Sequence, residues 1–283
     1  LDIRSVDYKT CTGCAACMNL CPKAAISMKE NGEGFLYPVI DEDKCIHCGL
    51  CYKRCPAIFP EYKNSTAPEC YAVMGDNALR ENSSSGGMFS IIADYVLRRG
   101  GYVCGAAYAG DKTSVEHIII SSADDLHKLR GSKYVQSKIG DTYIKIKQLL
   151  DGGNIVFFTG CPCQVAGLKS YLGKDYENLL TADLVCHGVP SHLVFKKFLK
   201  DLPVNGEIES VNFRQKKKYG WTPTMQVSYK NGEEYYKPSW ECDYYRAFLS
   251  IMACRKCCGN CKFNRLPPVS YTHLRAHETL SDL

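Results

Sequence analysis

Long hydrophobic runs are missing from this chain of 283 residues. No stretch reaches the roughly 18 apolar residues that a membrane-spanning helix needs. The chain also lacks the charged, apolar and small-residue regions of a secretory signal at its start. These absences favour a cytoplasmic protein, in which the 18 cysteines are expected to stay reduced. Leu1 is not an initiator methionine, so we expect that the natural start lies upstream.

The cysteines carry the strongest pattern. The spacing C-x-x-C-x-x-C-x-x-x-C-P occurs twice near the start, which is typical of ferredoxins with two 4Fe-4S clusters. Three closely spaced thiolates hold one cluster, and the fourth cysteine reaches the other. This rule predicts one cluster on Cys11, Cys14, Cys17 and Cys55, and another on Cys45, Cys48, Cys51 and Cys21. Zinc or a disulfide framework is the weaker interpretation, because zinc sites rarely show such a triple.

Strong net charge is also missing once these clusters are counted. The formal charge is +5 with neutral cysteines. Each oxidised cluster with its four thiolates contributes roughly −2, which leaves about +1. The composition therefore gives little support to a nucleic-acid-binding function.

Length predicts two structural units, since a domain commonly has roughly 150 residues. We expect a two-cluster ferredoxin-type domain at 1–62, a linker at 63–69 and a second domain at 70–268. In the second domain, apolar strand-like segments such as 102–108 and 115–120 alternate with segments of helical spacing. The chain is therefore expected to be an α+β protein, in which a small ferredoxin-type domain precedes a mixed α/β domain with functional loops after its strands.

Further elements of the second domain follow from local signals. Helices are expected from Ala123 to Arg130, from Tyr143 to Leu150 and after the N-cap Ser191. Buried strands are expected at 154–159 and 179–185. Asn231-Gly232 predicts a hairpin between two short strands.

Several blocks of the second region resemble the family of β-subunits of coenzyme F420 hydrogenases and dehydrogenases. The blocks are Ser83–Ser90, Arg130–Ser137, Gly160–Leu168, Asp183–Ser191, and Phe213-Arg214 with Gly220-Trp221. The family usually has threonine where this chain has Cys161, and it usually continues into an Asp-Phe-Trp-Gly segment that is absent here. The resemblance implies a flavin and iron–sulfur domain that is incomplete at its C-terminus.

A hydroxyl-rich turn before a helix suits a diphosphate, because hydroxyls and backbone N–H groups gather there. An ordinary serine-rich N-cap is the alternative interpretation of this turn. Arg130 and Lys133 add cations suited to phosphates. In the resembling family this region serves FAD, which implies as cofactor-binding residues Ser84, Ser85, Gly86, Gly87, Arg130, Ser132 and Lys133.

Four further cysteines come from three distant segments. Cys163 and Cys186 are expected in loops after two adjacent strands, and Cys258 and Cys261 form a C-x-x-C. The resemblance implies that these four hold a third 4Fe-4S cluster beside the flavin. Buried apolar cysteines or a zinc site are the alternatives. A second C-x-x-C, formed by Cys254 and Cys257, competes for this role, whereas Cys70, Cys104 and Cys242 are expected to be structural.

Two polar features remain. His187, next to Cys186, is a candidate catalytic residue that would relay a proton to a reduced flavin, with a structural histidine as the alternative. The basic run Arg214–Lys218, with Trp221 after it, is either a solvated edge or a grip for an anionic coenzyme.

The last 15 residues do not resemble natural protein sequence. Val269–Thr279 resembles the translated read-through of a transposon-based sequencing adapter. We therefore predict that 269–283 is an assembly artefact, and that His273 and His277 are not evidence for a metal site.

Together these features predict an iron–sulfur flavoprotein oxidoreductase. It would pass electrons from 4Fe-4S clusters to FAD and on to a hydride acceptor such as coenzyme F420 or another small molecule. Its electron partner would be ferredoxin or a hydrogenase or dehydrogenase subunit, with no nucleic acid and no membrane span. The alternative is a non-catalytic electron-transfer subunit of a hydrogenase or formate dehydrogenase complex, and a zinc adaptor is a weaker third interpretation.

Overall fold

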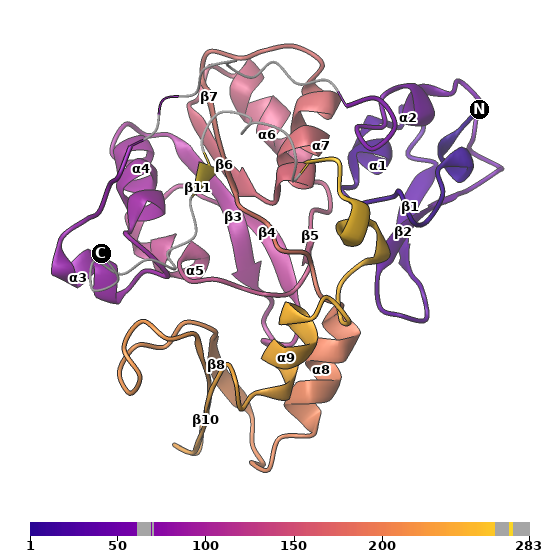
Figure 1. The fold of residues 1–283 in the computed structure, drawn as a ribbon. Coiled ribbons are helices and arrows are strands. Elements are labelled where there is room, and N and C mark those ends of the chain that lie inside the picture. Colours follow the sequence, from indigo (N-terminus) through magenta and orange to yellow (C-terminus); the bar gives the residue numbers. More distant parts are fainter. Residues whose placement is uncertain (61–68, 70, 264–271, 274–283) are drawn as a thin grey trace.

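The computed structural model describes residues 1–60, 69, 71–263 and 272–273. Its N-terminal part is a small cysteine-rich unit, drawn in indigo in Figure 1. The unit contains η1 (Ile3–Ser5), α1 (Ala16–Leu20), β1 (Ile26–Glu30), β2 (Leu36–Ile40) and α2 (Leu50–Lys53). The two strands pair antiparallel. Each cysteine run folds as a loop followed by a short helix, α1 or α2, which carries the third cysteine of its run.

A six-stranded sheet forms the centre of the molecule. Its strands lie in the order β11-β7-β6-β3-β4-β5. They are β3 (Tyr102–Tyr108), β4 (Val115–Ile120), β5 (Ser137–Lys138), β6 (Val156–Gly160), β7 (Leu179–Leu184) and β11 (Thr272–His273). β3 and β4 are antiparallel, and all other neighbours are parallel. The carboxyl ends of β6 and β7 therefore lie side by side, where sheets of this kind place their functional loops.

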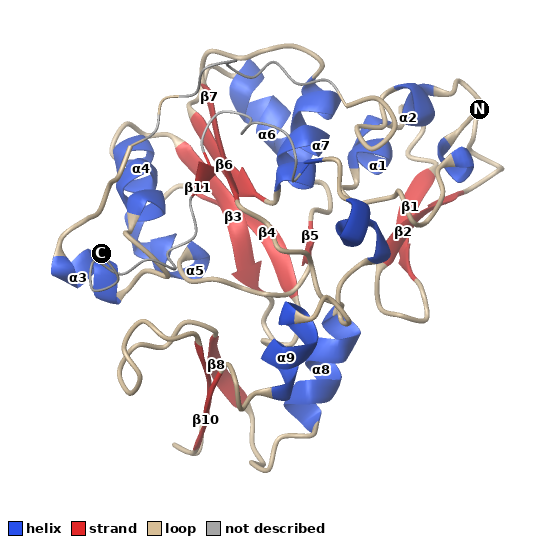
Figure 2. Ribbon diagram, viewed as in Figure 1, coloured by secondary structure: helices blue, strands red, loops and turns tan. Residues whose placement is uncertain are grey.

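Helices cover both faces of this sheet (Figure 2). They are α4 (Met88–Leu97), which follows α3 (Asn77–Glu81), then α5 (Leu126–Leu129), α6 (Thr142–Asp151) and α7 (Pro162–Leu172). α6 and α7 pack on one face around Phe158, while α4 and α5 pack on the other around Phe157. These neighbouring residues point in opposite directions because side chains alternate along a strand. Two buried faces explain why β6 is apolar throughout its first half.

The chain after β7 builds a smaller lobe, seen below the sheet in Figure 1. It contains α8 (His192–Lys200), β8 (Ile208–Asn212), β9 (Thr224–Tyr229), β10 (Glu234–Pro238) and α9 (Asp243–Leu249), after which the chain continues into η3 (Lys256–Asn260). The three strands form an antiparallel sheet in the order β10-β9-β8. Aromatic side chains, among them Phe195, Phe213 and Tyr245, fill the core between this sheet and the two α-helices.

The N-terminal unit packs directly against α7. Ala15 of the first cysteine loop belongs to the same buried cluster as the apolar face of α7. Gly167 permits this approach, since a Cβ there would lie 3.1 Å from Cβ of Cys14. Arg54 and Ser170 also bond each other across the contact, each through its side chain to the other's carbonyl. The first cysteine loop is thus held against the start of the helix that follows β6.

The predicted order of domains and the α+β class are confirmed, and several elements have the predicted bounds. The strands β3 and β4 match the segments 102–108 and 115–120. Asn231-Gly232 forms the turn between β9 and β10. The helix predicted from Ala123 to Arg130 is shorter. Its first three residues form a 3-10 turn, η2 (Ala123–Asp125), because the Ser122 side chain accepts from the N–H of Asp124 and tightens the start.

Some predictions fall on residues outside the described part of the chain. The linker at 63–69 is described only at Glu69, and Cys70 is not described. Within the predicted artefact at 269–283, the described residues are Thr272 and His273, which form β11 beside β7. Among the helices of the described residues, none is long and apolar enough to cross a membrane.

Ser191 links the N-terminal unit to α8, and its removal is a test of this contact. The residue is 1% exposed, its Oγ accepts from the N–H of Leu193 at 3.1 Å, and its hydroxyl donates to the Glu33 carbonyl. Ser191→Ala should lower the free energy of unfolding by about 1–2 kcal/mol, because α8 loses its cap and a carbonyl loses its donor. A thermal melt should fall by roughly 2–4 °C per kcal/mol. Ser250→Ala, which removes an exposed hydroxyl at the end of α9, is the control, and an equal fall in both variants would contradict the prediction.

Candidate iron–sulfur and cofactor site

The first cysteine group lies against α7. Cys14, Cys17 and Cys55 are buried, and Cys11 is half-buried. Burial, with the nearby charges of Cys55 and Cys11, raises the pKa of Cys14 to about 12. Cys55 thus lies with the first run, as the crossing rule predicts. Sulfurs this close stay protonated unless a cation compensates their thiolate charge, and bound iron supplies such compensation.

The second cysteine group lies nearer the surface. Cys48 is exposed, Cys51 is buried, and Cys21 and Cys45 are half-buried. Burial raises the pKa of Cys51, and a charge at Cys48 adds to this rise. This group is the more accessible of the two, so an external electron partner has access to it.

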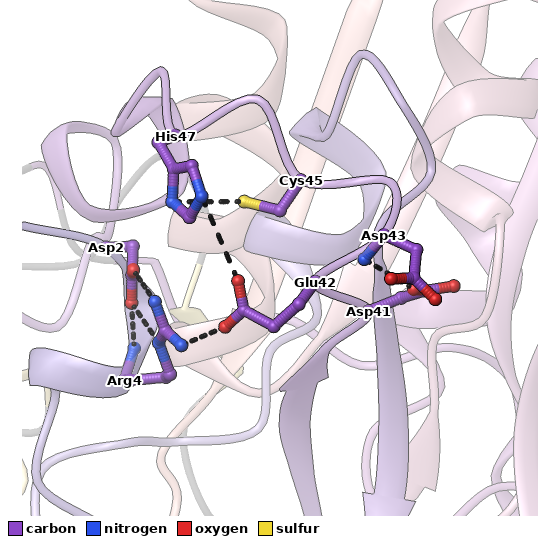
Figure 3. Close-up of polar contacts among 7 residues, drawn as sticks. All are labelled: Asp2, Arg4, Asp41, Glu42, Asp43, Cys45 and His47. Atoms are coloured by element: carbon purple, nitrogen blue, oxygen red, sulfur yellow. Dashed lines mark hydrogen bonds and ion pairs between the residues drawn. The ribbon is translucent and has the colours of Figure 1, made fainter.

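Exposed polar side chains surround Cys45 (Figure 3). Its Sγ lies 3.9 Å from Nδ1 of His47, whose Nε2 lies 3.9 Å from a carboxylate oxygen of Glu42. The three ligand atoms lie within 4.8 Å of one another, close enough to hold one metal ion. Glu42 is also paired with Arg4, and Cys45 belongs to the second cysteine run. We therefore treat these side chains as the surroundings of the second group and not as a separate metal site.

A third cysteine group lines a small cavity of about 20 Å³. Its walls include the four predicted ligands together with Cys257 and Thr12. The four are Cys163, Cys186, Cys258 and Cys261. Cys163 lies in the first turn of α7, Cys186 follows β7, and the last two lie at η3. The parallel pairing of β6 and β7 thus brings the predicted cysteines together.

Two pairs of thiols meet around this cavity. Cys161 donates to Cys186, which lowers the pKa of Cys186 and raises that of Cys161. Cys257 donates in the same way to Cys258, and the pKa of Cys258 falls to about 7. In each pair the accepting sulfur is the more easily deprotonated one, and the thiolate is the form that binds metal. Both acceptors belong to the predicted ligand set, whereas Cys254 is buried in the core of the smaller lobe.

The first and third groups are neighbours across the contact with α7. Burial raises the pKa of Cys163, and charges at Cys186 and Cys14 add to this rise. Cys163 and Gly167 share one face of α7 because they are four residues apart. Gly167 lies against Cys14, and Thr12 of the first loop lines the small cavity itself. The first group therefore lies next to the third, and it shares a buried cluster with the second.

A larger cavity of about 480 Å³ lies beside the small one. Six of the seven predicted cofactor residues line it, namely Ser84, Ser85, Gly87, Arg130, Ser132 and Lys133. Oγ of Ser84 accepts from the N–H of Ser132 at 2.7 Å, and Nε of Arg130 donates to Ser90 at 3.0 Å. The serine-rich turn and the Arg130 loop therefore form one wall at the N-terminal end of α4.

Two of the predicted cofactor residues have structural roles. Gly86 is outside the lining, and its carbonyl accepts from the N–H of Gly75 at 2.7 Å. Nζ of Lys133 lies 2.9 Å from the Arg130 carbonyl and 3.2 Å from the Gly131 carbonyl. Desolvation lowers the pKa of Lys133 to about 7. The lysine therefore braces its own loop, and Arg130 supplies a permanent positive charge to this wall.

The two cavities share a wall. Residues Cys186–Val189 line both of them. Nε2 of His187 lies 3.1 Å from the Leu249 carbonyl, and its ring meets Phe248 edge-on with centroids 5.1 Å apart. The predicted proton-relay residue is thus held between the sulfur-lined cavity and the larger one.

One residue of the basic run reaches the large cavity. Arg214 lines this cavity, and Nζ of Lys216 lies 3.6 Å from the ring centroid of Trp221. Burial, with the positive charges of Arg214 and Arg80, lowers the pKa of Lys216 to about 8. The run is therefore folded onto the protein, and its crowded cations favour an anion near the rim.

Three residues at the cavities or beside the cysteine groups were missed by the sequence analysis. His117 is 6% exposed, its Nε2 donates to the Thr159 carbonyl at 3.0 Å, and burial lowers its pKa to about 4. Gln164 caps α7 by accepting from the backbone N–H of its N-cap at 2.9 Å. Arg255 is fully buried beside the first cysteine group. Gln164 lies in the Gly-Cys-Pro-Cys-Gln block and was detectable there, but neither His117 nor Arg255 has a local signal.

Comparison with known protein families agrees with this arrangement. Residues 10–58 match the model of the 4Fe-4S dicluster domain. Residues 70–142 and 153–266 match the N-terminal and C-terminal models of the coenzyme F420 hydrogenase/dehydrogenase beta subunit. The last two matches together cover more than half of the chain.

Individual proteins with similar sequences include coenzyme F420 enzymes or their subunits. One subunit of the F(420)H(2) dehydrogenase of Methanosarcina mazei is 24% identical over 276 residues, covering 87% of this chain and 75% of that protein. The coenzyme F420-dependent sulfite reductase of Methanocaldococcus jannaschii is 26% identical over 190 residues, covering 66% of this chain and 29% of that protein. The chain thus spans less than a third of the reductase. A solved F420-reducing NiFe hydrogenase complex from Methanosarcina barkeri matches with a TM-score of 0.43 and 17% identity over 61% of this chain and 60% of the chain compared.

The matches to the beta-subunit and dicluster models identify this protein as an iron–sulfur member of the family of coenzyme F420 hydrogenase/dehydrogenase beta subunits.

Proposed function

We propose that this chain is an iron–sulfur flavoprotein oxidoreductase that delivers electrons from 4Fe-4S clusters to FAD and on to a small hydride acceptor such as coenzyme F420. Flavin suits this junction because it accepts electrons singly and releases them in pairs. The observation that carries the proposal is the shared wall. Residues Cys186–Val189 separate a cysteine-lined cavity from a cavity of cofactor size.

The donor sets fit iron–sulfur chemistry. Each of the three cysteine groups offers four sulfurs, and soft thiolate ligands select iron–sulfur clusters over hard cations. The first two sets are Cys11, Cys14, Cys17 and Cys55, and Cys45, Cys48, Cys51 and Cys21. For the third group we propose Cys163, Cys186, Cys258 and Cys261, because these line the small cavity and include both thiolate acceptors.

The large cavity fits a flavin nucleotide in size and lining. Its volume of about 480 Å³ lies within the roughly 300–1,000 Å³ of small-molecule sites. Ser84 and Ser132 would hold the diphosphate, with Arg130 and the first turn of α4 supplying positive charge. Val185 and Phe248 belong to the apolar part of the lining, which is suited to a flat ring.

An unpaired buried atom in this lining also points to a ligand. Nδ1 of His117 has no hydrogen-bond partner among the described residues, although the residue is buried. Its Nε2 donates to the Thr159 carbonyl, so Nδ1 is an acceptor. Buried polar atoms are rarely left unpaired, and a donor of the bound cofactor would satisfy this one.

Residues at the wall and rim supply the remaining functions. We propose that His187 moves a proton at the shared wall, where Leu249 and Phe248 fix its ring. Arg214 and Lys216 would hold anionic groups of the acceptor at the rim. The names of the relatives from Methanosarcina mazei and Methanocaldococcus jannaschii include coenzyme F420, which favours this coenzyme as the acceptor.

Substitution of the third cysteine group tests the electron path. Cys163→Ser and Cys186→Ser should each lose about four irons and keep the other eight or so, since the N-terminal groups stay intact. Flavin should remain bound, while its reduction by reduced ferredoxin slows by orders of magnitude. Cys161→Ser and Cys104→Ser, of which Cys104 is buried, are the controls. Both should keep the full iron content and the normal rate of flavin reduction. Full iron and normal flavin reduction in the Cys163 and Cys186 variants would remove the third cluster from the proposal.

Flavin affinity tests the large cavity. Ser84→Ala removes the hydroxyl that joins the serine-rich turn to the Arg130 loop. The loss of this contact should raise the Kd for FAD roughly fivefold to thirtyfold, which corresponds to about 1–2 kcal/mol. Fluorescence titration of flavin-free protein measures the change. Ser122→Ala, on an exposed turn outside the cavity, should bind FAD normally, and unchanged affinity in Ser84→Ala would place the diphosphate elsewhere.

A second candidate function is that of a non-catalytic electron-transfer subunit. The exposure of Cys48 favours it, because an exposed cluster suits docking of a redox partner. Steady-state reduction of coenzyme F420 by the isolated protein with reduced ferredoxin separates the two functions. Turnover by the protein alone is expected if it is an enzyme. Flavin that is reduced without any turnover until a partner subunit is added would favour the second candidate.

A further inference from the structure

Arg255 is the largest fully buried side chain in the described part of the chain, with 0% exposure. Its Nε donates to the Cys11 carbonyl at 2.8 Å, and its Nη2 donates to the Leu36 carbonyl at 2.9 Å. Nη1 lies 3.2 Å from Oε1 of Gln136. All three acceptors are neutral. Among the described residues, no carboxylate pairs with this guanidinium.

A buried guanidinium needs an anion, because neutral acceptors satisfy its N–H groups without compensating its charge. The candidates nearby are sulfurs. Nη2 lies 3.8 Å from Sγ of Cys11, within the range of an N–H···S hydrogen bond. Cys257 and Cys258, two and three residues further along the chain, line the small cavity. The side chain therefore lies at the junction of the first and third cysteine groups.

The surroundings fix the guanidinium in this place. Its plane lies over the ring of Tyr37, with the central carbon 4.0 Å from the ring centroid. Gln136 is itself held by a bond from Nε2 to the Thr12 carbonyl at 3.0 Å. Gly13 leaves room for the side chain, since a Cβ there would lie 2.8 Å from Nη1. A flexible ammonium lacks the planar fork that these contacts use.

We propose that Arg255 sets the reduction potential of the cluster held by Cys11, Cys14, Cys17 and Cys55, and thereby the driving force for electron transfer toward the third cysteine group. This inference rests on the iron–sulfur part of the proposed function. One-electron reduction adds a negative charge to the cluster and makes or breaks no bond. A fixed positive charge with an N–H directed at a ligand sulfur stabilises the reduced form and raises the potential. Arg255 acts through Cys11 and is a positioning residue.

The test is a redox titration of the holoprotein, followed by electron paramagnetic resonance. Arg255→Met should move one cluster step to lower potential by at least the 59 mV that correspond to a tenfold change in a one-electron equilibrium. Arg255→Lys keeps the positive charge but lacks the planar fork of N–H donors, so it should lower the potential by less. Arg54→Met is the matched control, because Arg54 also joins the N-terminal unit to α7 but bonds a carbonyl and no sulfur. The cluster reduction potentials of Arg54→Met should differ from those of the unaltered protein by less than a third of the shift expected for Arg255→Met.

Iron content separates this inference from the proposed function. An unaltered protein without 4Fe-4S signals would overturn the proposed function, whereas intact signals and an unmoved potential in Arg255→Met would overturn the role of Arg255. If Arg255→Met does not fold, Arg255→Lys and Gln136→Leu are measured, and the absence of any shift in both overturns the inference. The titration is repeated in a Cys186→Ser background, which lacks a proposed ligand of the third group. A shift that persists there supports the assignment to the Cys11 cluster, and a shift that disappears overturns it.

Discussion

The arrangement of this molecule depends on the close approach of the first cysteine loop to α7. Gly167 lies against Cys14, and a Cβ there would lie 2.8 Å from Oη of Tyr143 and 3.1 Å from Cβ of Cys14, so a larger residue would displace these neighbours. One turn earlier on the same face, Cys163 begins the third cysteine group. The spacing between two cysteine groups is thus set by backbone packing on the central sheet, which resists displacement because protein cores are close-packed. Electron transfer between groups needs such a fixed separation, and a linker alone does not provide it.

Charge compensation is the second constraint. Cys14, Cys17 and Cys55 of the first group are buried, and burial raises the pKa of each of them and of Cys163 in the third group. The thiolate forms of these cysteines are therefore unfavourable until metal binds. The same interior contains the buried guanidinium of Arg255, which is unfavourable without an anion. When clusters are present, the positive charge of the buried guanidinium and the negative charge of the thiolates compensate each other, so the free-energy cost of burying each charge is lower. We infer that cluster assembly and the docking of the N-terminal unit stabilise each other, because the cation and the sulfurs come from opposite sides of that contact.

The sequence was informative where a signal is local. Cysteine spacing predicted the two N-terminal sets of four cysteines because a cluster fixes the distance between its thiolates, and residues 10–58 match the dicluster model. Apolar strand-like segments predicted the bounds of β3 and β4, and the serine-rich turn predicted one wall of the large cavity. Arg255 could not be found in this way, since a lone arginine among cysteines is normally exposed and its burial comes from packing by distant segments. Lys133 has the expected position but braces its own loop, because its environment, and not its residue type, decides where its ammonium points.

The shared wall places the third cysteine group next to the large cavity. Residues Cys186–Val189 are not held by the central sheet alone. The N–H of Arg255 donates to the Val189 carbonyl at 3.0 Å, and Pro190 and Cys254 form an isolated antiparallel bridge. The segment that carries the last cysteines therefore also fixes the wall of the large cavity. Because these are backbone contacts, the wall is expected to keep its position when a single cysteine side chain of the third group is replaced. Flavin binding is therefore expected to persist in such variants, even though the two cavities share this wall.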